Sequence, residues 1–382
     1  MALHPVFGLV QVAVPVHFPP RRRPLVVTLV ISGFPLHRFG RELTPRLWEL
    51  AHRGAWRPDG GQAVLAASTC PNMLTLVTAT GPARHGIYAD SVIVGEESLP
   101  AWTQTSTVPT LFDIGWQAGR RMVAVLADSH LVPLLAAERA EAHWPSKGRF
   151  SPSTRLDERG CAQDAEVGMR LLHAIGDDVD FVLGQFSGVA TAGEEAGPDS
   201  DVAQDAIIGV DCEIGRLVER LERRWGDVVL CVLSDHDEEP VLTLTPFDLA
   251  DAVQVARLPA TVVHNGAMAF VGGHAPKVDD WLRRRPELMG CRQHGPGLRS
   301  VWLPPGSWFG TVEEHRRGVH GGPSAASQLA IVAGGHGAAT RIGGELGQRR
   351  PGMADWGATL AELLDLELTA ATGSSLAVAS LY

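Results

Sequence analysis

The sequence predicts an α/β fold, with a doubly wound, mostly parallel sheet, helices on both faces and a small inserted α+β cap. The main observation is that short apolar runs alternate with segments of helical periodicity. Each run is apolar throughout and rich in β-branched residues, which is typical of strands buried on both faces of a parallel sheet. The segment 239–307 interrupts this alternation, and we therefore expect it to form the cap.

The first predicted elements are a strand at 25–31 and the helix that follows it. Thr44 is expected as the N-cap of this helix, Pro45 takes its first helical position, and Gly54 lies just past its end. Further core strands are predicted at 122–126, 180–185, 228–233 and 329–333. Further helices are predicted at 110–118, 163–175, 200–225 and 353–366. In the longest helix, one apolar face is expected to consist of Val202, Ala206, Val210, Ile214, Leu217 and Leu221.

These elements divide the chain into an N-terminal arm at 1–24, a core at 25–238 and 308–382, and the cap at 239–307. Within the cap, we predict strands at 261–271 and 299–303 and a helix at 277–285. The Gly- and Ala-rich stretch 334–347 is expected to be a flexible loop.

Composition limits the kinds of partner. The formal net charge is −10 over 382 residues, which argues against a nucleic-acid polymer as partner. A small anionic ligand remains compatible, because a local metal ion or helix terminus can outweigh the global field. No apolar run is long enough for a membrane span, and Arg21–Arg23 follow the apolar N-terminal stretch instead of preceding it. The five widely spaced cysteines lack a CxxC pair, so we expect mostly buried, reduced thiols in a cytoplasmic protein.

Three segments carry the chemistry. Residues 66–87 read AASTCPNMLTLVTATGPARHGI, residues 228–236 read VVLCVLSDH, and residues 318–324 read GVHGGPS. Together they resemble the nucleophile segment and two metal-ligand segments of the alkaline phosphatase superfamily, in its nucleotide pyrophosphatase/phosphodiesterase and phosphonoacetate hydrolase branch. The resemblance implies the α/β fold and hydrolysis of a phosphate ester or phosphonate. The implied ligand is a small, phosphate-bearing anion, but its identity is not readable.

In that superfamily, a Thr or Ser hydroxyl held on a metal attacks phosphorus, and Thr69 is the residue that matches. A free hydroxyl is a poor nucleophile and needs a metal or a base to ionise. Asn72 and the first amides of the helix are expected to hold a phosphate oxygen. His85 completes the motif and is a possible auxiliary residue. The alternative is that Ser68 or Thr69 only caps a helix.

The resemblance also implies metal ligands, of which some are kept. Asp235 and His236 match one pair, and His320 matches the late histidine of the second metal. Carboxylates and imidazoles are sound zinc ligands, whereas an Asp in this position could also merely cap a turn. Asp237 follows the pair directly and is a possible auxiliary ligand.

Three positions depart from the family pattern. Ser32 stands where the family has an Asp after the first strand, and it is a weak ligand. With Gly197–Pro198 aligned, Ala190 replaces an Asp and Glu194 replaces a His. Ala190 cannot ligate, and Glu194 could. The expected cofactor is therefore one Zn²⁺ rather than two, or none, held by some of Asp235, His236, His320 and Glu194.

Three functions remain open. The first is a metal-dependent phosphoric-ester hydrolase with a remodelled site and Thr69 as nucleophile. The second is a catalytically silent member that binds an anionic ligand, because fold alone does not decide function. The third, ranked behind both, reuses the cleft without metal, with His85, His236, His320 and Glu194 as acid or base groups. Asp128, His130 and His37 lie near the same sheet edge and are interpreted singly as solvated loop residues.

Overall fold

The central sheet has seven strands in the order β2-β17-β9-β1-β8-β6-β7. The computed structural model describes residues 23–176, 178–243, 245–273, 276–311 and 316–377, so most of the predicted arm at 1–24 lies outside it. The parallel strands are β1 (Leu25–Ile31), β6 (Met122–Leu126), β7 (Ala142–Trp144), β8 (Phe181–Phe186) and β9 (Val228–Ser234). Antiparallel pairing adds β17 (Ala330–Ala333) and β2 (Ala55–Trp56) at one edge. The predicted mostly parallel sheet is confirmed.

Strand register brings three loop starts together. Ile31, the last residue of β1, pairs with Phe186 of β8 and with Ser234 of β9. The residues that follow these three strands therefore emerge side by side at one edge of the sheet. In open α/β sheets this carboxyl edge is where ligands bind.

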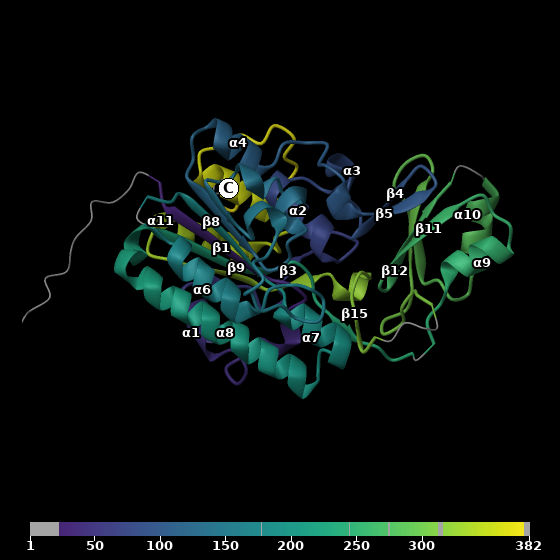
Figure 1. The fold of residues 1–382 in the computed structure, drawn as a ribbon, viewed down its shortest axis with the longest axis horizontal. Coiled ribbons are helices and arrows are strands. Elements are labelled where there is room, and N and C mark those ends of the chain that lie inside the picture. Colours follow the sequence, from purple (N-terminus) through teal and green to yellow (C-terminus); the bar gives the residue numbers. More distant parts are fainter. Residues whose placement is uncertain (1–22, 177, 244, 274–275, 312–315, 378–382) are drawn as a thin grey trace, which may run out of the picture.

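Helices cover both faces of the sheet, as predicted (Figure 1). Along β1, Leu25, Val27, Leu29 and Ile31 face one layer, and Val26 and Val30 face the other. The first layer contains α1 (Pro45–Arg53), α6 (Asp164–Ala174) and α8 (Asp201–Leu221). The second contains α2 (Thr69–Thr78), α4 (Leu111–Gln117), α11 (Gly337–Gln348) and α12 (Met353–Leu363).

The predicted apolar face of α8 is wrong in its first turns. Val202 is 59% exposed, and the buried face begins instead with Ala203 and Ile207 before it reaches Val210. Repeated steps of four residues drift away from a face that recurs every 3.6 residues, so Val202 turns toward solvent. The helix also ends at Leu221, earlier than expected, and a 3₁₀ turn follows.

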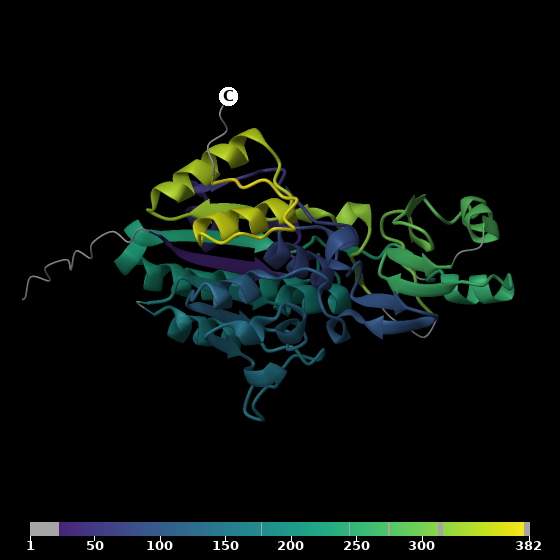
Figure 2. The same cartoon turned by 90° about the horizontal axis from the view of Figure 1, so that it is seen from above.

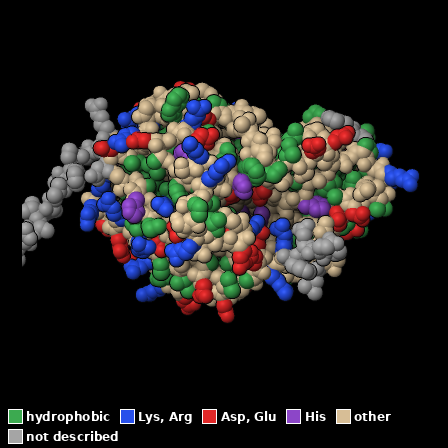
Figure 3. All heavy atoms as spheres, in the orientation of Figure 1, with side chains coloured by type: hydrophobic (Ala, Val, Ile, Leu, Met, Phe, Trp, Pro, Cys, Tyr) green, Lys and Arg blue, Asp and Glu red, His purple; other side chains and the backbone are tan. Residues whose placement is uncertain are grey.

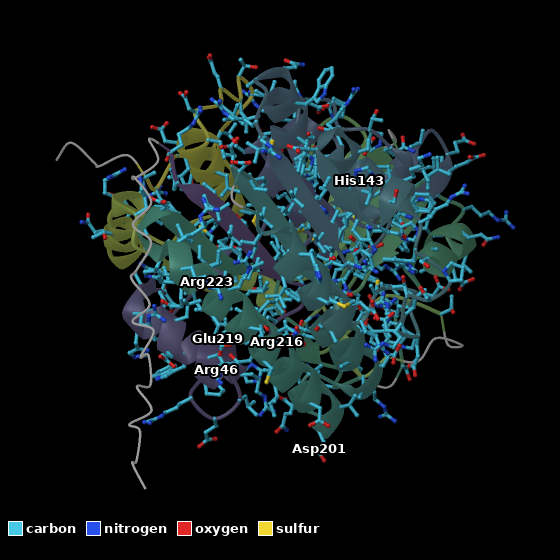
Figure 4. The ribbon with its side chains drawn as sticks, turned by 60° about the vertical axis from the view of Figure 1, so that its left-hand side comes forward. Arg46, His143, Asp201, Arg216, Glu219 and Arg223 are labelled. Atoms are coloured by element: carbon cyan, nitrogen blue, oxygen red, sulfur yellow. The ribbon has the colours of Figure 1, made fainter. Side chains whose placement is uncertain are left out.

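The exposed side of α8 is charged, and part of it lies beside α1. Figure 4 shows Asp201, Arg216 and Glu219 on this helix, Arg223 in the 3₁₀ turn that follows it, and Arg46 of α1 beside Glu219. The Arg46 guanidinium lies 3.9 Å from the Glu219 carboxylate, and both side chains are more than half exposed. Such exposed pairs contribute little stability, so this face mainly keeps the helix solvated.

The expected flexible loop at 334–347 is wrong, because most of it is the 12-residue helix α11. Ala338, Ala339, Ile342 and Leu346 recur at helical spacing and are buried against the sheet layer. The high glycine content concealed this apolar face. Packing therefore outweighs the low helix propensity of glycine here.

The inserted cap forms a separate lobe beside the core, as Figure 2 shows. Its antiparallel sheet contains β11 (Thr261–Asn265), β12 (Met268–Gly272), β13 (Gly290–Gln293) and β14 (Leu298–Trp302), and its helices are α9 (Leu249–Val255) and α10 (Pro276–Arg283). The single strand expected at 261–271 is a hairpin, which turns at Gly266 with φ +62°. The core hairpin of β4 (Ser91–Val94) and β5 (Glu97–Pro100) contributes Ile93 to the apolar cluster under the cap.

Two further observations concern the described residues as a whole. None of their helices has the length and apolar character that crossing a bilayer requires. All five cysteines are free, but only Cys70 and Cys231 are buried, whereas Cys212 and Cys291 are exposed. The expectation that most thiols are buried is therefore wrong.

Candidate active site at the carboxyl edge of the sheet

A cavity of about 330 Å³ lies at this edge of the sheet. Its walls come from the loops after β1, β6, β8 and β9, the start of α2, and helix α7 (Gly188–Ala196). Among the predicted site residues, those that line it are Ser32, Thr69, Glu194, His236 and His320. Figure 3 shows the molecule hollowed between core and cap, with histidine and acidic side chains in the furrow.

Thr69 begins α2 and faces the end of β9. The preceding Ser68 is extended, with φ −145°, and its side chain makes no capping bond, so the alternative role as a capping hydroxyl is not seen for it. The Oγ1 atom of Thr69 lies 3.4 Å from Nε2 of His236. The hydroxyl and the imidazole thus meet across the cavity wall.

Asp235 and His236 follow β9 and are completely or almost completely buried. Oδ1 of Asp235 accepts the backbone N–H of Gly33 at 3.1 Å and that of His236 at 2.9 Å. Its Oδ2 is buried and has no hydrogen-bond partner among the described residues. A buried carboxylate oxygen without a donor is costly, so this atom is a candidate ligand for a cation or for substrate-bound hydrogen.

The tautomer of His236 follows from its contacts. Its Nδ1 lies 2.9 Å from the carbonyl oxygen of Asp237, and a carbonyl can only accept. Nδ1 therefore carries the proton, and the lone pair of Nε2 faces Thr69. Burial lowers the pKa of His236, although the negative charge of Asp235 opposes this shift. Because burial outweighs the charge, the imidazole is neutral. It can act as a base or as a metal ligand.

Ser32 is held by a neutral partner. Its Oγ accepts a hydrogen bond of 2.9 Å from Nε2 of Gln185, and Oε1 of Gln185 accepts the N–H of Asp128 at 3.1 Å. The amide thus spans the carboxyl ends of β1, β8 and β6. A hydroxyl engaged in this way is a weak ligand for a divalent cation.

On the other side of the cavity, Glu194 is surrounded by cationic groups. Nε2 of His320 donates to its Oε1 at 3.2 Å, Arg159 pairs with the same oxygen, and Arg316 lies 3.4 Å from Oε2. Burial opposes ionisation of Glu194, but His320 and the two arginines outweigh it and hold its pKa well below the usual range. Burial also opposes protonation of His320, but Glu194 outweighs it and raises that pKa.

The two histidines of the site lie next to each other. The ring centroids of His236 and His320 are 4.5 Å apart, so contacts run from Thr69 through both imidazoles to Glu194. The cap supports His320 within this series of contacts, because the N–H of Ala267 in the β11–β12 turn donates to the carbonyl of His320 at 2.8 Å. In the same turn, Oδ1 of Asn265 accepts the N–H of Asp90 at 3.1 Å.

The structure does not bring Asn72 into the cavity. Its Oδ1 accepts the N–H of Val64 at 2.8 Å, and its Nδ2 lies within 3.3 Å of the carbonyl oxygens of Val64, Ala66 and Ser68. These backbone partners saturate the amide. Asn72 therefore braces the loop before α2, contrary to the expected contact with a phosphate oxygen.

Asp237 also lies outside the cavity wall. Its carboxylate accepts the N–H groups of Leu36 at 3.2 Å and of Glu238 at 2.7 Å. Burial raises its pKa to about 6. These bonds make it a brace for the loop after β9, whereas the expected auxiliary role was that of a ligand. His37 lies further away and pairs with Asp199 at 3.0 Å.

His85 is buried behind α2. Its Nδ1 accepts the N–H of Ile87 at 3.2 Å, so Nε2 carries the proton and donates to Oγ1 of Thr75 at 3.0 Å. Both ring nitrogens are thus engaged inside the core. Burial lowers the pKa of His85 to about 4, so this residue is a neutral structural group and does not reach the cavity.

His85 is expected to make stability depend on pH. As pH falls from 6.5 to about 4, the unfolded chain binds a proton that the folded chain refuses, and stability is lost across that window. The shift corresponds to roughly 3 kcal/mol. Denaturant unfolding should be measured at pH 7 and at pH 4. Between these two pH values, the free energy of unfolding of wild type should fall by roughly 3 kcal/mol more than that of His85→Gln. Equal losses in both proteins would contradict this assignment.

Arg159 and Asp90 are two of the cavity residues that the sequence analysis did not single out. Arg159 belongs to a loop that carries no family motif, and it meets Glu194 through the fold. Asp90 lies just beyond the nucleophile motif, and its Oδ1 accepts the N–H of Cys70 at 2.9 Å. Its nearness to that motif was the available signal. Asp128 and His130, interpreted singly as solvated, also line the cavity and pair at 3.1 Å.

The side chains present fit one cation better than two. Oδ2 of Asp235, Nε2 of His236 and Oγ1 of Thr69 offer a carboxylate, a neutral imidazole and a hydroxyl. At the second position, Ala190 has no donor atom and Glu194 is already paired with Arg159. No group of three His, Cys, Asp or Glu side chains in the described part of the chain is arranged to hold a metal ion. A two-metal site does not fit.

The fold and these segments define a member of the alkaline phosphatase superfamily. Residues 26–285, about two thirds of the chain, match the family of type I phosphodiesterases/nucleotide pyrophosphatases, and the chain belongs to this family. A search of curated proteins finds no match. Members of the family are metal-dependent hydrolases, usually with zinc, which supports a phosphoester or phosphonate hydrolase in general.

Solved structures with low sequence identity share the fold. The chain is similar to murine ectonucleotide pyrophosphatase/phosphodiesterase 5 in complex with AMP, with a TM-score of 0.71 at 16% identity, over 92% of this chain and 97% of that one. It is also similar to phosphonoacetate hydrolase from Sinorhizobium meliloti 1021 in complex with phosphonoformate. There the TM-score is 0.63 at 17% identity, over 82% of this chain and 91% of that one.

Proposed function

We propose that this protein hydrolyses a phosphate ester or phosphonate, with Thr69 as the nucleophile and His236 as the group that accepts its proton. The observation that carries the proposal is the 3.4 Å separation between Oγ1 of Thr69 and the unprotonated Nε2 of His236. Family membership supports the reaction class, and AMP or a phosphonate in the similar structures supports a small anionic ligand.

For an ester, the reaction would have two displacement steps. First, the Oγ1–P bond forms, the P–O bond to the leaving group breaks, and the proton of Thr69 passes to Nε2 of His236. The leaving-group oxygen takes a proton from this imidazolium. Next, water attacks phosphorus, gives its proton to the same nitrogen, and displaces Thr69, whose hydroxyl is then restored.

Burial and hydrogen bonds prepare His236 for this work. Asp237 fixes its tautomer through the carbonyl, and the charge of Asp235 favours the imidazolium that forms when the proton arrives. A single zinc ion bound by Asp235, His236 and Thr69 would instead supply Lewis-acid activation of the hydroxyl. Those three side chains would hold the ion.

Ligand binding without turnover is the second candidate, and the pairing of Glu194 favours it. The arginines engage the carboxylate where the family has metal ligands, so the cavity could keep an anion without activating it. Metal-independent hydrolysis differs from this only in the reactivity of Thr69. Turnover therefore separates the two functions.

The test combines turnover with trapping of the nucleophile. Wild-type protein, purified once with chelator and once with added Zn²⁺, is offered bis(p-nitrophenyl) phosphate, p-nitrophenyl phosphate, AMP and phosphonoacetate. We expect release of product from at least one substrate and, after acid quenching, phosphorylated Thr69 in the peptide digest. Turnover with the label on another residue would refute the assigned nucleophile, and no turnover in either preparation would favour the silent binder.

A further inference from the structure

The cationic side chains around Glu194 occupy the place where the resemblance would put a second metal ion. Of the three ligand positions implied there, only His320 is retained. Ala190 has no side-chain ligand atom, and Glu194 places a carboxylate where the family has an imidazole. A buried carboxylate needs a counter-charge, and Arg159 and Arg316 supply it. The charge of the Glu194 carboxylate is therefore balanced without a metal ion. Nδ1 of His320, in contrast, is buried and has no hydrogen-bond partner among the described residues.

Arg159 differs from its neighbour in reaching the cavity. Both arginines pair with Glu194, but the cavity wall includes Arg159 and not Arg316. The side chain of Arg159 is 44% exposed, whereas that of Glu194 is 10% exposed. A guanidinium carries more N–H donors than one carboxylate oxygen can take, so N–H groups of Arg159 remain for a ligand in the cavity.

The position of Arg159 is suited to an anion bound at Thr69. A continuous series of contacts crosses one cavity of about 330 Å³. It runs from Thr69 through His236, His320 and Glu194 to Arg159. Thr69 and Arg159 both line this cavity, so a phosphoryl group bound at the Thr69 hydroxyl would share the space that the Arg159 guanidinium borders. Planar guanidinium groups bind such oxygens in pairs, with charge-assisted hydrogen bonds.

We propose that Arg159 replaces the second metal ion of the family as the group that binds the phosphoryl oxygens, and that Glu194 positions it. This inference rests on the proposed function for the location of the phosphorus. It predicts that phosphate binding survives removal of metal, because the positive charge is covalently part of the chain. It also assigns Glu194 a positioning role, in which the carboxylate aims the guanidinium and does not ligate zinc.

The first experiment is calorimetric binding of inorganic phosphate to the full chain in the presence of chelator. Wild type should bind, Arg159→Met should bind about 10- to 100-fold more weakly, and Arg159→Lys should be intermediate. Arg155→Met is the matched control, because Arg155 pairs with Glu166 at 3.2 Å and lies outside the cavity wall. It should bind as wild type does. Loss of wild-type binding on chelation, or unchanged binding by Arg159→Met, would overturn the proposal.

The second experiment measures zinc content. Wild type should hold no more than one zinc ion per chain by elemental analysis, whereas Ala190→Asp combined with Glu194→His should hold one more, because His320 then gains two ligands of the family type. Two zinc ions per wild-type chain would overturn the proposal. Phosphate binding that depends on Arg159, without any turnover, would refute only the hydrolase function. Turnover that is the same in Arg159→Met and in wild type would refute only this inference.

Discussion

Thr69→Ala is expected to lower kcat by about 10³-fold or more, because no other hydroxyl among the described residues is placed against the lone pair of His236. Thr69→Ser should keep measurable turnover, since it retains the oxygen and loses only the methyl group that fixes its rotamer. Thr69 is only half-buried, so both variants should unfold at nearly the wild-type temperature. This separates loss of chemistry from loss of structure.

The measurement is steady-state turnover of whichever substrate the wild type cleaves, together with calorimetric phosphate binding. Phosphate binding should change far less than kcat in Thr69→Ala, because the proposed oxygen-binding group is Arg159. A variant that retains turnover within about tenfold of wild type would rule out Thr69 as the attacking group. Equal losses in Thr69→Ala and Thr69→Ser would point to misplacement of α2 instead of loss of the nucleophile.

Asp235→Ala is expected to destabilise the fold by about 3–5 kcal/mol, the largest stability effect in the site. The carboxylate is fully buried and accepts the N–H groups of Gly33 and His236, and truncation would leave both donors unpaired. Gly33 adopts φ +64°, so its loop depends on outside support to hold a left-handed turn. Denaturant unfolding measures the loss directly.

Asp235→Asn distinguishes the structural role from the chemical one. Its amide oxygen can accept both N–H groups, so the free energy of unfolding should stay within about 1 kcal/mol of wild type. The negative charge beside His236 would be gone, and kcat should fall by about 10²-fold. If Asp235→Asn proved as unstable as Asp235→Ala, or as active as wild type, the corresponding role would be refuted.

The sequence predicted the core better than the surface because continuous apolar runs have one structural meaning. The predicted strand at 25–31 coincides with β1, and the strand predicted at 122–126 coincides with β6. The predictions failed where glycine was misinterpreted. The glycines of α11 were taken as a sign of a loop, and Gly266, at the turn of a hairpin, was placed inside a single strand. In both cases tertiary packing decided what local propensity left open.

The site was predictable only where it coincides with motifs. Thr69 begins α2, His236 follows β9 of the central sheet, and His320 follows β15 (Gly318–Val319) of a separate two-stranded sheet, yet all three line one cavity. Asn72 and His85 belong to the same motif, yet their polar atoms are consumed by the backbone and by Thr75. Arg159 approaches Glu194 from a loop 35 residues earlier in the chain, and no spacing rule connects such a pair.

The turn between β11 and β12 has a consequence for any exchange of the cap. Through it, the cap contributes the hydrogen bonds that hold Asp90 and His320 in place. A substituted cap without this turn would lack both bonds. We therefore expect an exchange of the cap to leave the pocket beneath it intact only where the turn is retained.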